Sequence, residues 1–171
     1  TNNAARSGAV VAEHLTELGF PSTEDDLVTS AQAAQGLLER ELEPGSKVLV
    51  SGTQNLIDHV IAAGMVPVTS ATDEPVAVIQ GYDPQMTWPR LDEVGFAVQN
   101  GATWYATNTD STRPTDRGLV PGAGAAIAAV RSTVNHEAIV VGKPHRPLLE
   151  EAVGRTAAEN PIFVGRRNDT G

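Results

Sequence analysis

The sequence has 171 residues, of which 40% are apolar, carries a formal charge of -9 and contains no cysteine. The acidic balance argues against nucleic acid and anionic membranes as general partners, and the lack of cysteine excludes disulfides and thiolate metal sites. No apolar run approaches the ~20 residues that a bilayer-spanning helix needs. We therefore expect a cytoplasmic protein of one domain, or of two small domains.

In chain order, the sequence predicts helices that alternate with short buried strands. Val10, Val11, Leu15 and Leu18 recur at helical spacing, and Gly19 follows as a stop. The next elements expected are a helix over 30–42, ended by Pro44-Gly45, and a strand over 48–50. Further helices are expected over 53–65, 87–102, 121–134 and 146–159, and further strands over 66–70, 76–81, 103–108, 138–142 and 161–165.

Several of these strands are continuous apolar runs rather than alternating ones. Such runs, separated by helices of about 10 to 15 residues, are typical of a parallel sheet with both faces covered. The predicted class is therefore α/β.

Polar groups stand where three predicted strands end or where a helix begins after a turn: 1–3, 142–144 and 165–171. Ligands of open α/β sheets bind at the carboxyl ends of strands. The hydroxyl of Thr1 and helix-start N–H groups can donate to phosphate oxygens, and Lys143, fixed between a glycine and a proline, supplies a compact positive charge. The alternatives are a helix N-cap at Thr1 and a merely solvated lysine.

Three other features are interpreted as structural. The Gly-Ala-Gly run at 122–124 lacks nucleotide-loop spacing and predicts a tight helix entry. The histidines, His14, His59, His136 and His145, show no metal-ligand spacing. The aromatic residues Trp88, Trp104 and Tyr105 are interpreted as core or interface residues.

An ordered set of motifs carries a resemblance through almost the whole chain: TNNAARS, LVTSAQAAQGLL, VLVSGTQNL, NGATWYATNTDSTRPTDRGLVPGAGA, VVGKP and VGRRNDTG. The set resembles the haloacid dehalogenase superfamily. More narrowly, it is similar to the NagD-like branch, which includes phosphoglycolate and glycerol phosphate phosphatases.

The resemblance implies a Rossmann-like parallel-sheet core over 1–25 and 136–171, with a large α/β cap domain inserted over 26–135. It implies that Thr1 and Asn2 match the second motif, which binds the transferring phosphoryl group, and that Lys143 matches the third. Asn108, Thr109 and Asp110 would form the cap loop that selects substrate.

The implied reaction is hydrolysis of a small phosphate monoester, of the glycerol phosphate or phosphoglycolate type. It uses an aspartate nucleophile, an aspartyl-phosphate intermediate and Mg²⁺. A homodimer through the cap is also implied.

The sequence departs from the family in two places. The first motif, Asp-x-Asp-Gly, is absent, and with it the nucleophile. In the fourth motif, Arg166 and Gly171 stand at positions where the family has metal-serving acids, which leaves Asp169 as the candidate metal ligand. We therefore expect the sequence to be part of a longer polypeptide.

Two alternatives follow from the same residues. One is a catalytically inactive relative that binds a phosphorylated metabolite through Thr1, Lys143 and Arg166. The other takes Thr1 as an N-terminal nucleophile of an amidohydrolase, with its own amine as the base.

Overall fold

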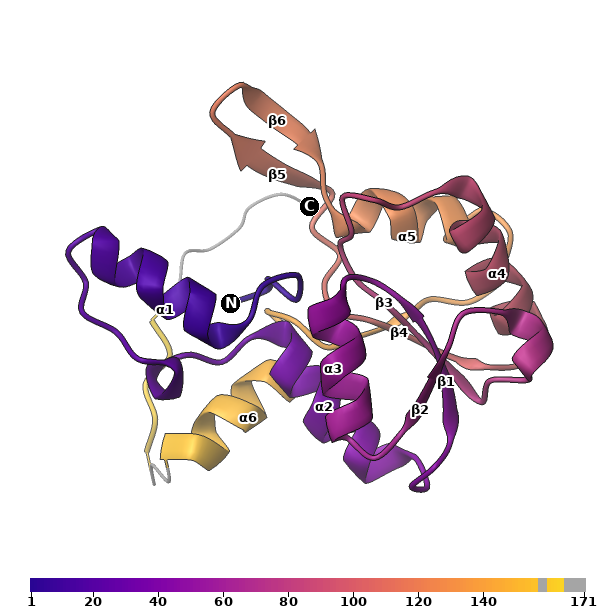
Figure 1. Ribbon diagram of the computed structural model, residues 1–171, viewed down its shortest axis with the longest axis horizontal. Coiled ribbons are helices and arrows are strands. Elements are labelled where there is room, and N and C mark those ends of the chain that lie inside the picture. Colours follow the sequence, from indigo (N-terminus) through magenta and orange to yellow (C-terminus); the bar gives the residue numbers. More distant parts are fainter. Residues whose placement is uncertain (157–159, 165–171) are drawn as a thin grey trace.

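A computed structural model describes residues 1–156 and 160–164 of the chain. Its centre is a five-stranded parallel sheet in the order β2-β1-β3-β4-β7. A separate antiparallel pair, β5 and β6, protrudes from the body of the molecule (Figure 1). The strands are β1 (Lys47–Ser51), β2 (Val66–Val68), β3 (Ala77–Gln80), β4 (Thr103–Ala106), β5 (Thr112–Thr115), β6 (Gly118–Pro121) and β7 (Ile139–Val140).

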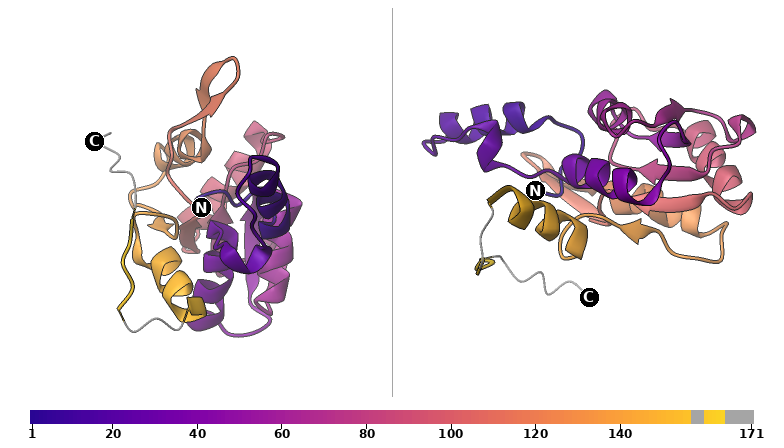
Figure 2. Two further views of the ribbon diagram at one scale, coloured as in Figure 1. Left: turned by 90° about the vertical axis from the view of Figure 1, so that its left-hand side faces the viewer. Right: turned by 90° about the horizontal axis from the view of Figure 1, so that it is seen from below.

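Helices cover the sheet on both faces. In Figure 1, α2, α3 and α6 lie on one side of the sheet and α4 and α5 on the other. The right-hand view of Figure 2 shows α1, in indigo, beyond the end of the sheet. The helices are α1 (Gly8–Glu17), η1 (Glu24–Asp26), α2 (Ser30–Glu41), α3 (Gln54–Ala62), η2 (Ala71–Asp73), α4 (Trp88–Gln99), α5 (Ala123–Arg131) and α6 (Arg146–Thr156).

The core consists of two apolar layers, one on each face of the sheet. Val48, Val50 and Ile79 point into the layer under α2 and α3, whereas Leu49 and Val78 point into the layer under α4 and α5. Burying each such side chain contributes roughly 1.5–3 kcal/mol, and both sets are buried. This explains why the strands are continuously apolar, and the predicted α/β class with a covered parallel sheet is confirmed.

Local signals in the sequence set the helix boundaries. Helix α2 begins with a capping box, in which the Thr29 hydroxyl accepts from the N–H of Gln32 and the Gln32 side chain accepts from the N–H of Thr29. It ends at Glu41, one residue before the predicted end, where Leu42 turns extended. Ser30, the first residue of α2, donates from its N–H to the carbonyl of Thr1 at 2.9 Å, which ties the start of α2 to the N-terminal segment.

The hairpin of β5 and β6 was not among the predicted elements. Its turn lies at Asp116-Arg117, and Gly118 follows with φ of +126°, a conformation that glycine adopts at little cost. The Thr-Asp-Arg-Gly run was the available signal. The strands carry a proline and an arginine rather than alternating apolar residues, which hides the pattern.

The strand predicted over 161–165 is wrong for its described part. Residues 161–164 have no regular structure, and Ile162, Phe163 and Val164 are 89%, 65% and 90% exposed. An apolar run becomes a buried strand only where neighbouring strands hydrogen-bond to it and side chains cover it. Among the described residues, no strand pairs with this run.

Strand β7 and helix α6, assigned by sequence to the core, lie beside elements assigned to the cap. Val140 of β7 pairs with Ala106 of β4, and α6 packs on α2. The division into a core and a cap stays a prediction. Across the described ranges, no helix combines the length and the apolar character that a membrane crossing requires.

Candidate functional site at the strand ends

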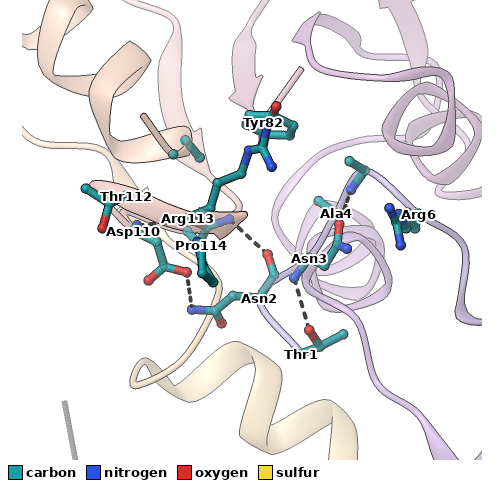
Figure 3. Close-up of a pocket in the computed structure, with 14 residues that line it drawn as sticks. Thr1, Asn2, Asn3, Ala4, Arg6, Tyr82, Asp110, Thr112, Arg113 and Pro114 are labelled. Atoms are coloured by element: carbon teal, nitrogen blue, oxygen red, sulfur yellow. Dashed lines mark hydrogen bonds between the residues drawn. The ribbon is translucent and has the colours of Figure 1, made fainter. Parts of the chain in front are cut away.

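A cavity of about 360 Å³ opens near the carboxyl ends of β3, β4 and β7 (Figure 3). Five segments that are far apart in sequence form its wall: the N-terminal segment before α1, the end of β3, the loop after β4, the start of the hairpin, and the start of α5. Its lining residues are Thr1, Asn2, Asn3, Ala4, Ala5, Arg6, Tyr82, Asn108, Asp110, Thr112, Arg113, Pro114, Gly122 and Ala123.

Asn2 joins the N-terminal segment to the end of β7. Its side-chain Oδ1 accepts from the backbone N–H of Lys143 at 2.7 Å, and its Nδ2 donates to the carbonyl of Lys143 at 3.2 Å. The two bonds satisfy both backbone groups of Lys143 with one amide. This pair of bonds, the Asn2 clamp, fixes the lysine backbone beside the cavity.

The same asparagine is tied to the loop after β4. Its backbone carbonyl accepts from Asn108 Nδ2 at 2.9 Å and from the Ser30 hydroxyl at 2.8 Å. Its Nδ2 also lies 3.3 Å from Asp110 Oδ2. Asn108 is 6% exposed, and its Oδ1 accepts from the N–H of Asp110 at 3.1 Å. The predicted loop residues Asn108 and Asp110 are thereby locked to Asn2.

Gly142 makes the approach of Asn2 to β7 sterically feasible. A Cβ at this position would lie 2.5 Å from the carbonyl oxygen of Thr107 and 2.7 Å from Oδ1 of Asn2. Both distances are well inside van der Waals contact, so a larger residue would displace the clamp. The prediction that glycine helps to fix the backbone of Lys143 has this physical basis.

Thr1 precedes the Asn2 clamp and lines the same cavity. The hydroxyl of Thr1 accepts from the N–H of Asn3 at 3.3 Å, which leaves its own proton free to donate. A hydroxyl donor therefore lies one residue from the side chain that holds the backbone of Lys143.

Gly122 and Gly124 allow the start of α5 to pack closely against the loop after β4, in agreement with the predicted tight helix entry. Gly122 is the N-cap of α5, and the N–H of Gly124 donates to the carbonyl of Asp110 at 2.9 Å. A Cβ on either glycine would meet the carbonyl oxygen of Asp110 or Thr109 at 2.2 or 2.3 Å. The start of α5 thus holds the loop after β4, and the helix-entry prediction is confirmed.

The structure brings together four of the predicted site residues: Thr1, Asn2, Asn108 and Asp110 line the cavity. Lys143 is not part of the lining and is coupled to it through Asn2. Thr109 is exposed and is absent from the lining. Asp169 lies outside the described residues.

Sequence reasoning did not anticipate Arg6 and Tyr82 in the wall. Arg6 and Arg113 place two guanidinium groups in the cavity wall, whereas Asp110 supplies its single carboxylate. In a chain of formal charge -9, this local balance favours an anionic ligand. The signal available for Arg6 was its place in the turn before the first helix.

The aromatic residues are divided between core and surface. Trp104 and Tyr105 are each 2% exposed and belong to the core, as predicted. Trp88, the first residue of α4, is 73% exposed, so of the two predicted roles only that of an interface residue fits its position. Tyr82, which was not singled out, is the aromatic side chain at the cavity.

Within 1–156 and 160–164, no group of three or more histidine, aspartate or glutamate side chains converges in a way that would hold a metal ion. Asp110 alone contributes a carboxylate to the cavity lining. A hard cation such as Mg²⁺ prefers several oxygen ligands. The described residues therefore do not form a magnesium site by themselves.

The fold and the cavity together define an α/β protein with an anion-facing polar site at the strand ends. A family model described as haloacid dehalogenase-like hydrolase matches residues 1–66. The chain is 46% identical over 170 residues to a D-glycerol 3-phosphate phosphatase of Mycobacterium tuberculosis, and 33% identical over 154 residues to an acid sugar phosphatase of Staphylococcus aureus.

Solved structures of phosphatases are also similar to this chain. A glycerol phosphate phosphatase of M. tuberculosis in complex with magnesium matches with a TM-score of 0.88 at 47% identity, over 92% of this chain and 48% of that one. A thermostable NPPase of Geobacillus stearothermophilus matches with a TM-score of 0.86 at 30% identity, over 93% of this chain and 63% of that one. Over almost its whole length, the chain is similar to haloacid dehalogenase-like hydrolases.

The matches cover this chain almost completely but the relatives only in part. The alignment with the mycobacterial relative covers 99% of this chain and 48% of the relative. The alignment with the staphylococcal relative covers 90% of this chain and 58% of the relative. The chain thus spans about half the length of the curated relatives it matches.

Proposed function

We propose that the protein is a phosphatase that hydrolyses a small phosphate monoester, of the glycerol phosphate or phosphoglycolate type. The observation that supports the proposal is the Asn2 clamp, which ties the backbone of Lys143 to the residue after Thr1, beside a cavity lined by two arginines and one carboxylate. The similarity to a D-glycerol 3-phosphate phosphatase supports the choice of substrate.

In this proposal the described residues position and neutralise the phosphoryl group. The Thr1 hydroxyl donates to a phosphoryl oxygen, because its bond with the N–H of Asn3 uses the oxygen and leaves the proton available. Lys143 offsets the negative charge of the phosphoryl group, whose transfer depends on positioning and charge neutralisation. Asn2 acts through Lys143 and positions it.

We further propose Mg²⁺ as the cofactor and an aspartate nucleophile that forms an aspartyl-phosphate. The support is the family, and the magnesium complex of the similar mycobacterial enzyme. When bound, the ion would supply positive charge at the phosphoryl oxygens. Asp169 is the proposed ligand from this sequence, and the roles argued for Thr1, Asn2 and Lys143 do not depend on the ion.

The loop of Asn108, Thr109 and Asp110 is proposed to face the leaving group. Asn108 and Asp110 line the cavity and are anchored to Asn2 and α5, so their polar groups are held in place. We also propose that residues 1–25 and 136–171 form a core and that residues 26–135 form a cap domain. A cytoplasmic location is proposed as well, and the absence of cysteine is consistent with it.

The native gene product is expected to release inorganic phosphate from glycerol 3-phosphate or 2-phosphoglycolate when Mg²⁺ is present, and to stop when EDTA removes it. The measurement is colorimetric phosphate release at varied Mg²⁺. Calorimetric binding of either ester without any turnover, with and without Mg²⁺, would favour the alternative of an inactive relative that binds a phosphorylated metabolite.

A homodimer through the cap is proposed as the assembly. Trp88 and Phe96 of α4 are 73% and 54% exposed and line a shallow cavity of about 160 Å³ between α4 and α5. Exposed apolar patches of this kind mark interaction surfaces. Replacing Trp88 by serine is expected to shift the molar mass in light scattering from dimer to monomer. Phe20→Ser, at a residue 67% exposed beyond α1, is the control and should leave the mass unchanged.

A further inference from the structure

Arg113 is held against an aromatic ring at the wall of the cavity. Its guanidinium carbon lies 4.9 Å from the ring centroid of Tyr82, within the range of a cation–π contact. Arg113 comes from β5 and Tyr82 from the segment after β3, so the contact ties the protruding hairpin to the main sheet. Figure 3 shows the Arg113 side chain extending toward Tyr82 and away from Thr1.

The tyrosine side of this contact is itself anchored. Asp83 accepts from Arg90 Nη1 at 2.5 Å and from the N–H of Gln85 at 2.8 Å. The same arginine donates to the carbonyl of Gly52 at 3.0 Å, which fastens the segment to the end of β1. Tyr82 is therefore a fixed platform for the guanidinium of Arg113.

The donors of Arg113 are not used by the rest of the described chain. Within those residues its guanidinium makes no ion pair and no hydrogen bond. The N–H groups of a guanidinium lie in one plane and match a carboxylate with two parallel bonds, and a cation–π contact does not use them. Asp110, the nearby carboxylate of the lining, is directed to Asn2 instead.

Two ends of one cavity thus carry different groups. Thr1 and Asn2, whose side chain is bonded to the backbone of Lys143, lie at one end, and Arg113 on Tyr82 lies at the other. A phosphoryl group bound at the first end would direct its leaving group toward Arg113. A volume of about 360 Å³ is enough for a small phosphate ester.

We propose that Arg113 is a specificity-determining residue that binds an anionic leaving group, so that phosphate esters bearing a carboxylate are a substrate class of this protein. The proposal rests on the proposed phosphatase function. It extends that function by assigning the carboxylate to the Arg113–Tyr82 pair rather than to the residues that bind phosphate.

The test compares 2-phosphoglycolate with glycerol 3-phosphate as the two probes, using the native gene product. For each ester, kcat/KM is measured with Mg²⁺ and the Kd is measured by calorimetry. Arg113→Gln is expected to lower the preference for the carboxylate ester about tenfold, which corresponds to about 1.4 kcal/mol. Tyr82→Leu, which removes the platform, should lower it in the same direction.

Arg117→Gln is the matched control, because Arg117 belongs to the same hairpin and does not line the cavity. It should leave the preference unchanged. An unchanged preference in Arg113→Gln would overturn the proposal, as would a wild-type protein that hydrolyses glycerol 3-phosphate but neither binds nor hydrolyses 2-phosphoglycolate.

The binding measurement separates this proposal from the phosphatase function. If neither ester is hydrolysed but the Kd for 2-phosphoglycolate rises tenfold in Arg113→Gln, the anion site at Arg113 is supported and the proposed phosphatase function is wrong. If neither ester binds nor reacts, both proposals are wrong.

Discussion

Replacing Lys143 by methionine in the native gene product is expected to lower kcat for phosphate ester hydrolysis roughly 10²- to 10³-fold. Removal of one preorganised charge or donor that faces the transferring group typically has an effect of this size. The side chain of Lys143 is exposed and its backbone bonds to Asn2 survive the change, so the free energy of unfolding should shift little. Steady-state kinetics and a urea titration measure the two effects separately.

The control for Lys143 is Arg146→Met, which removes another exposed cation three residues further along the chain. Arg146 does not line the cavity, and its replacement should leave kcat within about twofold of the wild type. If the two variants behave alike, Lys143 has no special role and the assignment of the phosphoryl end is wrong.

Replacing Gly142 by alanine is expected to destabilise the protein by about 1–3 kcal/mol and to abolish most of its turnover. The added Cβ would lie 2.5 Å from the carbonyl oxygen of Thr107 and 2.7 Å from Oδ1 of Asn2. Neither atom is the end of a flexible chain: one is backbone, and the other is held by the clamp. Overpacking of this kind forces shifts in the surroundings, and here the shift would separate Asn2 from Lys143.

Gly154→Ala provides the comparison for Gly142. Gly154 lies in α6, and a Cβ there would meet nothing within 4 Å. Alanine favours the helix over glycine by about 0.8–1 kcal/mol, so this variant should be more stable than the wild type and equally active. Equal stability and activity of Gly142→Ala and the wild type would show that the strand end is not packed as described.

Most of the fold could be predicted because its signals are local. Continuous apolar runs such as 48–50, the stop at Gly19 and the small-residue helix after Gly122 each fix an element within a few neighbouring residues. The run at 161–164 shows the limit of this reasoning. Its composition is that of a buried strand, but burial depends on partners elsewhere in the chain, and the described structure leaves Phe163 65% exposed.

The site could be predicted only where strand ends mark it. Asn2, Asn108 and Lys143 each follow the end of a strand or begin a turn, and parallel strands bring such positions to one edge of the sheet. Tyr82 and Arg113 could not be paired from sequence, because their contact depends on the course of a hairpin whose strands lack an alternating pattern. The Asn2 clamp could not be predicted from sequence either, because it depends on how closely Asn2 approaches Gly142 in the folded chain.

The most direct test of the central claim is the position of orthovanadate, a phosphoryl mimic, in a crystal structure of the native gene product. We predict that it binds in the cavity beside Asn2, within hydrogen-bond distance of the Thr1 hydroxyl and the ammonium of Lys143. An anion bound elsewhere, with Thr1 and Lys143 both out of reach, would contradict the account.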